Sequence, residues 1–144
     1  MLIDNKNVYS DSQAITATAD STNKVNVMSY LGRNQAGDAF ITVKATAAFN
    51  NLTSLTIDLQ TSDTENGTYA SIQSVTVPLA NLTKGAKVAA FRVVPIAFVK
   101  PWSKIVYTVT GTAPSTGAVF AALTREDGLR YAAGLYIDKG ITKG

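Results

Sequence analysis

The chain has 144 residues, which is long enough for one domain with a hydrophobic core of its own. Only 16% of the residues are charged and the formal net charge is +3, so charge alone does not indicate a nucleic-acid-binding protein. Histidine and cysteine are both absent. This excludes disulfides, thiolate metal sites and imidazole acid–base catalysis near neutral pH.

The first part of the chain predicts an arm followed by two short strands. Residues 1–12 are polar with scattered apolar side chains, which is typical of an extended arm, and they lack the basic start and apolar run of a signal peptide. Short strands are expected at residues 14–18 and 24–30, with a turn at residues 20–23 between them. No apolar stretch approaches the roughly 18 residues that a membrane span requires.

The middle of the chain shows the clearest strand patterns. Residues 39–45 and 54–62 alternate apolar and polar side chains, and in the second stretch Leu55, Ile57 and Leu59 all point to one face. A loop containing Asn66-Gly67 then leads into a returning strand at residues 69–77, which predicts a hairpin. Strands with one dry and one wet face are typical of antiparallel sheets.

The last strands are expected at residues 88–94, 102–110 and 118–123. We interpret residues 102–123 as a second hairpin, because the segment 111–117 is rich in Gly, Pro and Ser. Both of its strands are apolar on both faces, so a facing sheet must cover them. We therefore predict an all-β, single-domain antiparallel sandwich, a jelly roll of about eight strands.

The predicted strands divide the chain into an N-terminal arm (residues 1–12), a jelly-roll domain (13–123) and a C-terminal tail (124–144). The tail mixes charges, glycines and large apolar residues without a clean period, and we expect it to dock on its own domain or on a neighbour. We also expect the arm and the tail to matter more for assembly than for folding.

No pattern of residues indicates catalysis. The ten acidic residues lie mostly in predicted turns and in the terminal segments, and no spacing favours a glycosidase-like pair of carboxylates. Asp63, Glu65 and Asn66 offer oxygen ligands for calcium, but their spacing matches no calcium loop, and a solvated hairpin loop is the preferred interpretation. We expect no enzyme activity, no cofactor and no metal.

The charges are distributed unevenly along the chain. Residues 1–65 carry four basic and seven acidic residues, whereas residues 66–125 carry six basic residues and no acidic one. The only tryptophan, Trp102, lies between Lys100 and Lys104. Three interpretations are open: docking to an acidic partner, single-stranded nucleic acid stacking on Trp102, or edge charges that prevent aggregation. The first and third together are favoured over the second.

Several sequence blocks resemble those of the jelly-roll capsid cement proteins of tailed bacteriophages, of the type found in Bordetella phage heads. The blocks are Asp4, residues 9–16 (YSDSQAIT), 19–23 (ADSTN), 52–62 (LTSLTIDLQTS) and 107–112 (YTVTGT). The resemblance covers residues 4 to about 123 and implies a protein on the outside of a phage head. Such a protein binds between major capsid protein subunits and resists internal DNA pressure.

From this resemblance we expect the major capsid protein and further copies of the same chain as partners, in a homodimer or a homotrimer, with no direct nucleic acid and no membrane. The protein would be made in the host cytoplasm and reside on the outer surface of the capsid. The alternative is a carbohydrate- or receptor-binding sandwich of a phage tail or fibre, with Trp102, Tyr107 and Tyr69 as a stacking platform. The candidate partner-binding residues are Leu2, Ile3, Tyr9, Lys84, Lys87, Arg92, Lys100, Trp102, Lys104, Arg125, Arg130, Tyr131 and Tyr136.

Overall fold

The computed structural model describes residues 7–27, 39–93 and 100–124, and most of these residues lie in β-strands. A short 3-10 helix, η2 (Leu79–Asn81), follows one of the strands. The strands are β1 (Val8–Ala14), β2 (Ala19–Asp20), β3 (Val25–Asn26), β4 (Ala39–Ala47), β5 (Leu52–Ser62), β6 (Ala70–Pro78), β7 (Lys87–Val93), β8 (Trp102–Gly111) and β9 (Ala118–Thr124).

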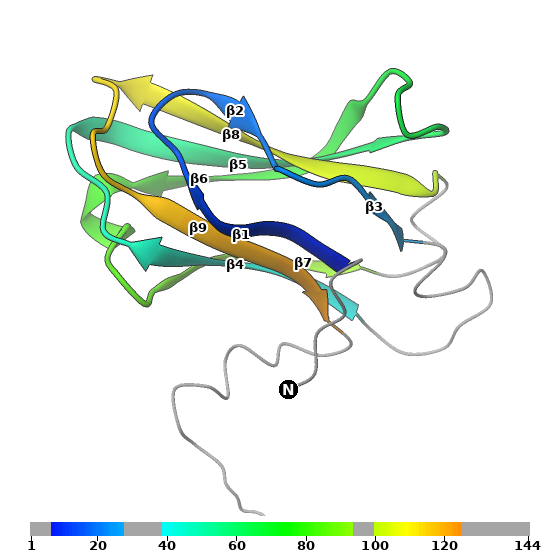
Figure 1. Ribbon diagram of the computed structural model, residues 1–144, viewed down its shortest axis with the longest axis horizontal. Helices are drawn as coiled ribbons and strands as arrows, with labels where there is room; N and C mark the ends of the chain where they lie inside the picture. Colours follow the sequence, from blue (N-terminus) through cyan, green and yellow to red (C-terminus); the bar gives the residue numbers. More distant parts are fainter. Residues whose placement is uncertain (1–6, 28–38, 94–99, 125–144) are drawn as a thin grey trace, which may run out of the picture.

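The strands form two antiparallel sheets that pack face to face. Sheet A has the order β1-β9-β4-β7, and sheet B has the order β2-β8-β5-β6, with β3 pairing the same strand β8 as β2 does. Figure 1 shows the sheets as two layers, with β8 and β5 above β9 and β4. When β2 and β3 are counted as the two halves of one interrupted strand, this order is that of a jelly roll, so the predicted fold class is confirmed.

The centre of sheet B follows directly from the alternating sequence. Leu55, Ile57 and Leu59 of β5 are fully buried, while the residues between them face outward. In the β5–β8 pair, Ile57 lies opposite Tyr107 and Leu59 lies opposite Ile105, and these partners are equally buried. Period-2 alternation on two adjacent strands thus produces one apolar face, which needs a second sheet to cover it.

Sheet A provides that cover. Ile41 and Val43 of β4 lie opposite Leu123 and Ala121 of β9, and all four side chains belong to the same hydrophobic core. The hairpin predicted for residues 54–77 is confirmed as β5 and β6. The hairpin predicted for residues 102–123 is wrong, because β8 lies in sheet B and β9 in sheet A, so the turn between them crosses from one sheet to the other.

The predicted N-terminal arm extends too far into the domain. Strand β1 begins at Val8, and Val8, Tyr9 and Ser10 are all buried. The pairing of β1 with β9 shifts register twice within seven residues, and these irregularities remove the alternation that would have revealed the strand. Residues 8–12 therefore belong to an edge strand of sheet A and take part in the fold. The expectation that the arm matters more for assembly than for folding stays a prediction.

The other differences concern the short strands and the ends. Of residues 14–18 only Ala14 lies in a strand, as the last residue of β1, and the strand predicted at residues 24–30 is reduced to the two residues of β3, within the described part of the chain. The C-terminal tail lies outside the described residues, apart from Thr124 at the end of β9.

The crossing turn from β8 to β9 is held against the loop between β4 and β5. The Asn50 side-chain oxygen accepts hydrogen bonds from the backbone N–H of Ser115 at 2.8 Å and of Thr116 at 3.2 Å. Gly117 has a φ of +137°, and its Cα faces the buried ring of Phe49 so closely that an added Cβ would overlap that ring. The crossing therefore needs a glycine for both its backbone conformation and its space.

This geometry predicts different costs for two glycine substitutions. Gly117→Ala should lower the free energy of unfolding by about 3 kcal/mol, because it combines positive-φ strain with overlap in the core. Gly85→Ala is the matched control, since Gly85 also has a positive φ (+87°) but no atom lies within 4 Å of an added Cβ. It should cost about 1 kcal/mol. Urea unfolding of both variants measures the difference, and equal costs would contradict the packing argument.

Candidate partner-binding surfaces

The candidate partner-binding residues fall into three groups in the structure. Leu2, Ile3, Arg125, Arg130, Tyr131 and Tyr136 lie outside the described residues. Tyr9 is in the core, and Arg92 lies on β7 at the register position opposite Phe40. Lys84, Lys87, Lys100, Trp102 and Lys104 lie at or near the surface.

Tyr9 is a correction, because its side chain is fully buried and contacts the other sheet. Its hydroxyl lies 2.7 Å from Ser103 Oγ on β8. Ser103 donates its single proton to the Val25 carbonyl oxygen at 3.1 Å, so Tyr9 is the donor to the serine. Tyr9 thus links sheet A to sheet B and is not available to a partner.

Tyr107 makes the reciprocal connection from sheet B to sheet A. It is buried, and its hydroxyl lies 2.9 Å from Ser10 Oγ on β1. Ser10 donates its own proton to Gln13 Oε1 at 2.7 Å, so Tyr107 donates to Ser10. We call these two hydrogen bonds, Tyr9–Ser103 and Tyr107–Ser10, the tyrosine braces.

Burial keeps both tyrosines neutral. Burial raises the pKa of Tyr9 and of Tyr107 well above the ordinary value, and the hydrogen bonds that join them to Ser103 and Ser10 offset only a part of this effect. Neither hydroxyl is positioned or charged for proton transfer to a substrate at neutral pH. Their role in the structure is to satisfy polar groups inside an apolar core.

The lysines around Trp102 are paired with acidic residues that are distant in sequence. Lys104 Nζ lies 3.0 Å from Asp20 Oδ2, and Lys100 Nζ lies 3.7 Å from Asp63 Oδ2. Residues 66–125 contain no acidic residue, but the fold brings an acidic residue from elsewhere in the chain next to each of these two lysines. The fold therefore does not place a purely basic surface on both sides of Trp102.

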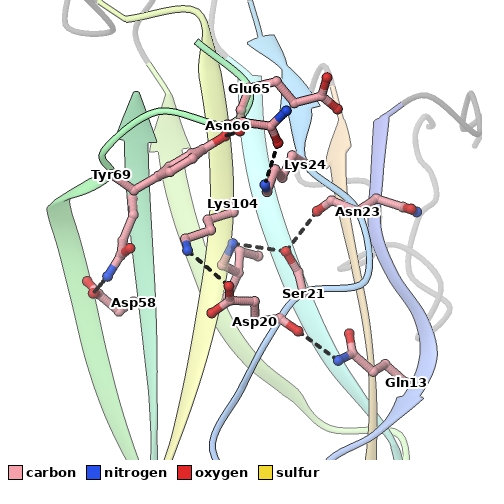
Figure 2. A network of polar contacts seen from close by, with 12 residues as sticks. Gln13, Asp20, Ser21, Asn23, Lys24, Asp58, Glu65, Asn66, Tyr69 and Lys104 are labelled. Carbon is pink, nitrogen blue, oxygen red and sulfur yellow. Dashed lines mark hydrogen bonds and ion pairs between the residues drawn. The ribbon is translucent and has the colours of Figure 1, made fainter. Parts of the chain in front are cut away.

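Figure 2 shows the polar cluster around Tyr69 on the outer face of sheet B. The ammonium groups of Lys104 and Lys24 lie 4.8 and 5.7 Å from the centre of the Tyr69 ring, which is a cation–π arrangement. Lys24 also donates to Asn66 Oδ1 at 3.4 Å, and the Tyr69 hydroxyl donates to the Glu65 carbonyl oxygen at 2.7 Å. The cluster ties the β5–β6 loop to the segment that carries β2 and β3.

The same cluster argues against the aromatic platform of the alternative function. Of the three predicted stacking residues, Tyr107 faces the core and Tyr69 already has two ammonium groups near its ring. Trp102 is half-buried and alternates with the buried Ser103, so it lies on the outer face. The three rings do not form one surface on which a sugar could stack.

The sequence analysis did not include Lys44, which the fold places beside Lys84 and Lys87. Lys44 of β4 lies directly opposite Lys87 of β7, and the Gly85 N–H donates to the Ala45 carbonyl oxygen at 2.8 Å, which places the turn carrying Lys84 beside them. We call Lys44, Lys84 and Lys87 the lysine end of sheet A. Like charges opposite each other on neighbouring strands are unfavourable unless a counter-charge is supplied. Only the strand register reveals this arrangement.

Within the described residues, no three acidic side chains gather into a group that could hold a metal ion. Asp63, one of the three residues considered for calcium, pairs with Lys100 instead. No helix in the described part of the chain is long and apolar enough to span a membrane.

The fold and its surfaces define a small jelly-roll protein with a braced core and a lightly charged exterior. A comparison with protein-family models matches the Bbp16 family, a family of Bordetella phage proteins, over residues 9–123. Because this match covers well over half of the chain, the protein belongs to the Bbp16 family. No curated protein matches the chain.

Burial of Tyr9 and Tyr107 predicts a loss of stability at alkaline pH. Unfolding lowers the pKa of each tyrosine to about 10, so above that pH the unfolded state releases protons that the folded state retains. The free energy of unfolding should be unaffected below about pH 10 and then fall by up to about 1.4 kcal/mol per pH unit for each brace. Comparing urea unfolding of the protein and of the double variant Tyr9→Phe/Tyr107→Phe tests this, since the double variant should lose this part of the slope.

The Tyr69 cluster predicts a small, salt-dependent contribution to stability. Lys104→Met removes both the ion pair to Asp20 and the cation–π contact, and should lower the free energy of unfolding by about 1 kcal/mol. Asp20→Asn removes only the ion pair and should cost less. Thermal unfolding at low and high salt separates the two contacts, because only the ion pair is strongly screened. A loss of several kcal/mol in either variant would contradict a surface role.

Proposed function

We propose that this phage protein is a structural component of the virion that binds the outer surface of the head between major capsid protein subunits. In this role it stabilises the head against the pressure of the packaged DNA, and it carries no catalysis, cofactor or nucleic-acid contact. The observation that carries the proposal is the family match, because its limits, residues 9–123, coincide with the jelly roll from β1 to β9. The sequence resemblance to capsid cement proteins supports the same role.

The construction of the sandwich supports a load-bearing function. A clamp between subunits transmits force only if its two sheets do not slide over one another. The tyrosine braces connect the sheets in both directions, from β1 to β8 and from β8 to β1. The contacts of Asn50 with Ser115 and Thr116 fix the crossing turn at one end of the sandwich.

The lysine end of sheet A supports docking to an acidic surface. Lys84 and Lys87 are exposed, and Lys44 is half-buried beside them. Lys100 and Lys104, which flank Trp102, form ion pairs with Asp63 and Asp20. An acidic capsid surface opposite the lysine end would attract its cations and speed association.

Removal and re-addition of the protein tests the proposed function. Purified phage heads are stripped of the protein, and the purified chain is added back. Electron microscopy of the particles then locates the bound copies, and a heat challenge measures head stability. We expect binding at the junctions between capsid subunits and restored resistance to heat. Heads that bind no protein, or that resist heat equally well without it, would overturn the proposal.

The docking surface makes a separate prediction. Lys84→Gln/Lys87→Gln should weaken binding to stripped heads by about tenfold and reduce its dependence on salt, since two cations facing an acidic surface are lost. Lys24→Gln, in the Tyr69 cluster, is the matched control and should leave binding unchanged. Cosedimentation with heads at several salt concentrations measures both effects. If both variants weakened binding equally, the lysine end would not be the docking surface.

A further inference from the structure

Strand β9, at the centre of sheet A, is apolar on both of its faces. Its residues Val119, Ala121 and Leu123 belong to the hydrophobic core between the sheets. Because side chains alternate along a strand, Phe120 and Ala122 point to the opposite, outer face of sheet A. Sheet B covers the first set of side chains and does not reach the second.

One row of residues crosses this outer face from strand to strand. Val8 of β1 lies opposite Ala122 of β9. Ala122 in turn lies opposite Thr42 of β4, and Thr42 lies opposite Ala90 of β7. Val8 and Ala122 are buried, although neither belongs to the core cluster between the sheets, and Thr42 beside them is fully buried. Something other than sheet B therefore covers these side chains.

Sheet B shows how an outer face of this fold looks when it faces solvent. In its central strands β5 and β8, the outward side chains between Ser54 and Gln60 and between Lys104 and Thr108 are all at least partly exposed. A place in the middle of a sheet is thus not enough to bury an outward side chain completely. The burial in sheet A requires a segment that lies on its outer face.

The burial is confined to one part of that face. It is complete at Ala122 and Thr42, whereas Phe120, two residues earlier on β9, is only half-buried. Towards the edge strand β7, Ala90 is exposed. The covering segment therefore lies over β1, β9 and β4, close to the end of the sheet where β9 finishes at Thr124.

Residues 125–144 continue the chain from that place, and their composition suits an apolar face. Large apolar side chains follow each other closely in this segment, at Leu129, Tyr131, Leu135, Tyr136 and Ile137. An extended chain advances about 3.3–3.6 Å per residue, and neighbouring strands lie about 4.8 Å apart. The segment is therefore long enough to return from the end of β9 across its two neighbouring strands.

The other stretches of chain at this end of sheet A fit the face less well. Residues 28–38 and 94–99 each connect a strand of one sheet with a strand of the other, so their ends are fixed in different layers. Residues 1–6 precede the edge strand β1, and their large apolar side chains are only those of Met1, Leu2 and Ile3. Position and composition together favour the C-terminal segment.

We propose that residues 125–144 turn back from β9 and dock on the outer face of sheet A of the same chain. Their large apolar side chains bury Ala122 and pack against the half-buried rings of Phe40 and Phe120. The family match ends at residue 123, so this contact adds to the jelly roll that defines the family. The inference goes beyond the proposed function and does not depend on it, and it leaves the lysine end accessible, since the burial fades towards β7.

Thiol labelling of the full-length protein tests the cover. The chain has no cysteine, so Ala122→Cys places a single reporter thiol under the proposed cover, and Thr56→Cys places one on the open face of sheet B. A maleimide should label position 122 at least about tenfold more slowly than position 56. Thr42→Cys repeats the measurement with a substitution that adds little volume. Rapid labelling at both covered positions would overturn the inference.

Charged substitutions identify the segment that protects the reporter. In the Ala122→Cys protein, Leu135→Asp/Ile137→Asp should speed labelling at least about tenfold, because a carboxylate resists burial against an apolar face. Leu2→Asp/Ile3→Asp is the matched control and should leave labelling slow. Circular dichroism checks that each variant is folded. Labelling that stays slow in the first variant, or that both variants speed equally, contradicts the assignment. Protection that appears only at high protein concentration would place the segment on another copy and also overturn the inference.

Limited digestion with trypsin gives the reciprocal measurement from the side of the sheet. Cleavage after Arg130 releases residues 131–144, and mass spectrometry distinguishes this product from cuts within the jelly roll. Phe120→Ala removes apolar surface from the docking face and should speed the release several-fold. Val106→Ala, on the outer face of sheet B, is the matched control and should leave the rate unchanged. Equal rates in the two variants would show that the segment does not lie on sheet A.

Discussion

The pairing of β5 with β8 is the interaction on which the rest of the fold depends. These two central strands of sheet B are in register from Leu52–Gly111 to Ser62–Trp102, with one irregularity near the start. Together they build the apolar face that sheet A covers, and they also position the polar atoms of the braces. Tyr107 and Ser103 lie on the core face of β8, so the register that buries Ile105 between them also brings their hydroxyls within reach of Ser10 and Tyr9.

The braces explain why polar side chains occur in this core at all. A buried hydroxyl without a partner destabilises the fold by about 1–3 kcal/mol, whereas a paired hydroxyl is a modest net gain. Each tyrosine here donates to a serine whose own proton is donated to a further acceptor, Val25 O or Gln13 Oε1. The sheets are therefore joined by two short chains of hydrogen bonds. Unlike apolar packing, these bonds have a direction and resist sliding of one sheet over the other.

The parts of the fold that the sequence predicts are those with regular alternation. Strands β4, β5, β6 and β7 were expected within a few residues of their actual limits, because one of their faces is dry or their turns are distinctive. Strand β1 was missed because its irregular pairing buries three consecutive residues. The pairing of β8 with β9 was wrong for another reason: alternation shows which side chains share a face, but it does not identify the neighbouring strand.

The candidate surfaces were predictable only where charge position along the chain corresponds to position in space. At Lys104 the two positions do not correspond. Its partner Asp20 is 84 residues away in sequence, and the pairing of β2 with β8 brings the two side chains together. Two of the three residues of the lysine end, Lys84 and Lys87, were predicted from the sequence as partner-binding residues. Lys44 was not, because its position beside them depends on the register of β4 with β7. The exposure of β6 also required the sheet order, since the sequence of a strand does not identify its neighbours.

The lysine end and the edge of β6 differ in charge. The lysine end is cationic, so the binding that we propose there should be weakened by salt, because the Debye length shortens to about 8 Å at physiological ionic strength. The edge of β6 is uncharged and carries the exposed side chains of Ile72 and Val75, so a contact made there would depend on apolar burial and would not be screened by salt. Lys87 also lines a groove beside β6, which makes the two surfaces neighbours.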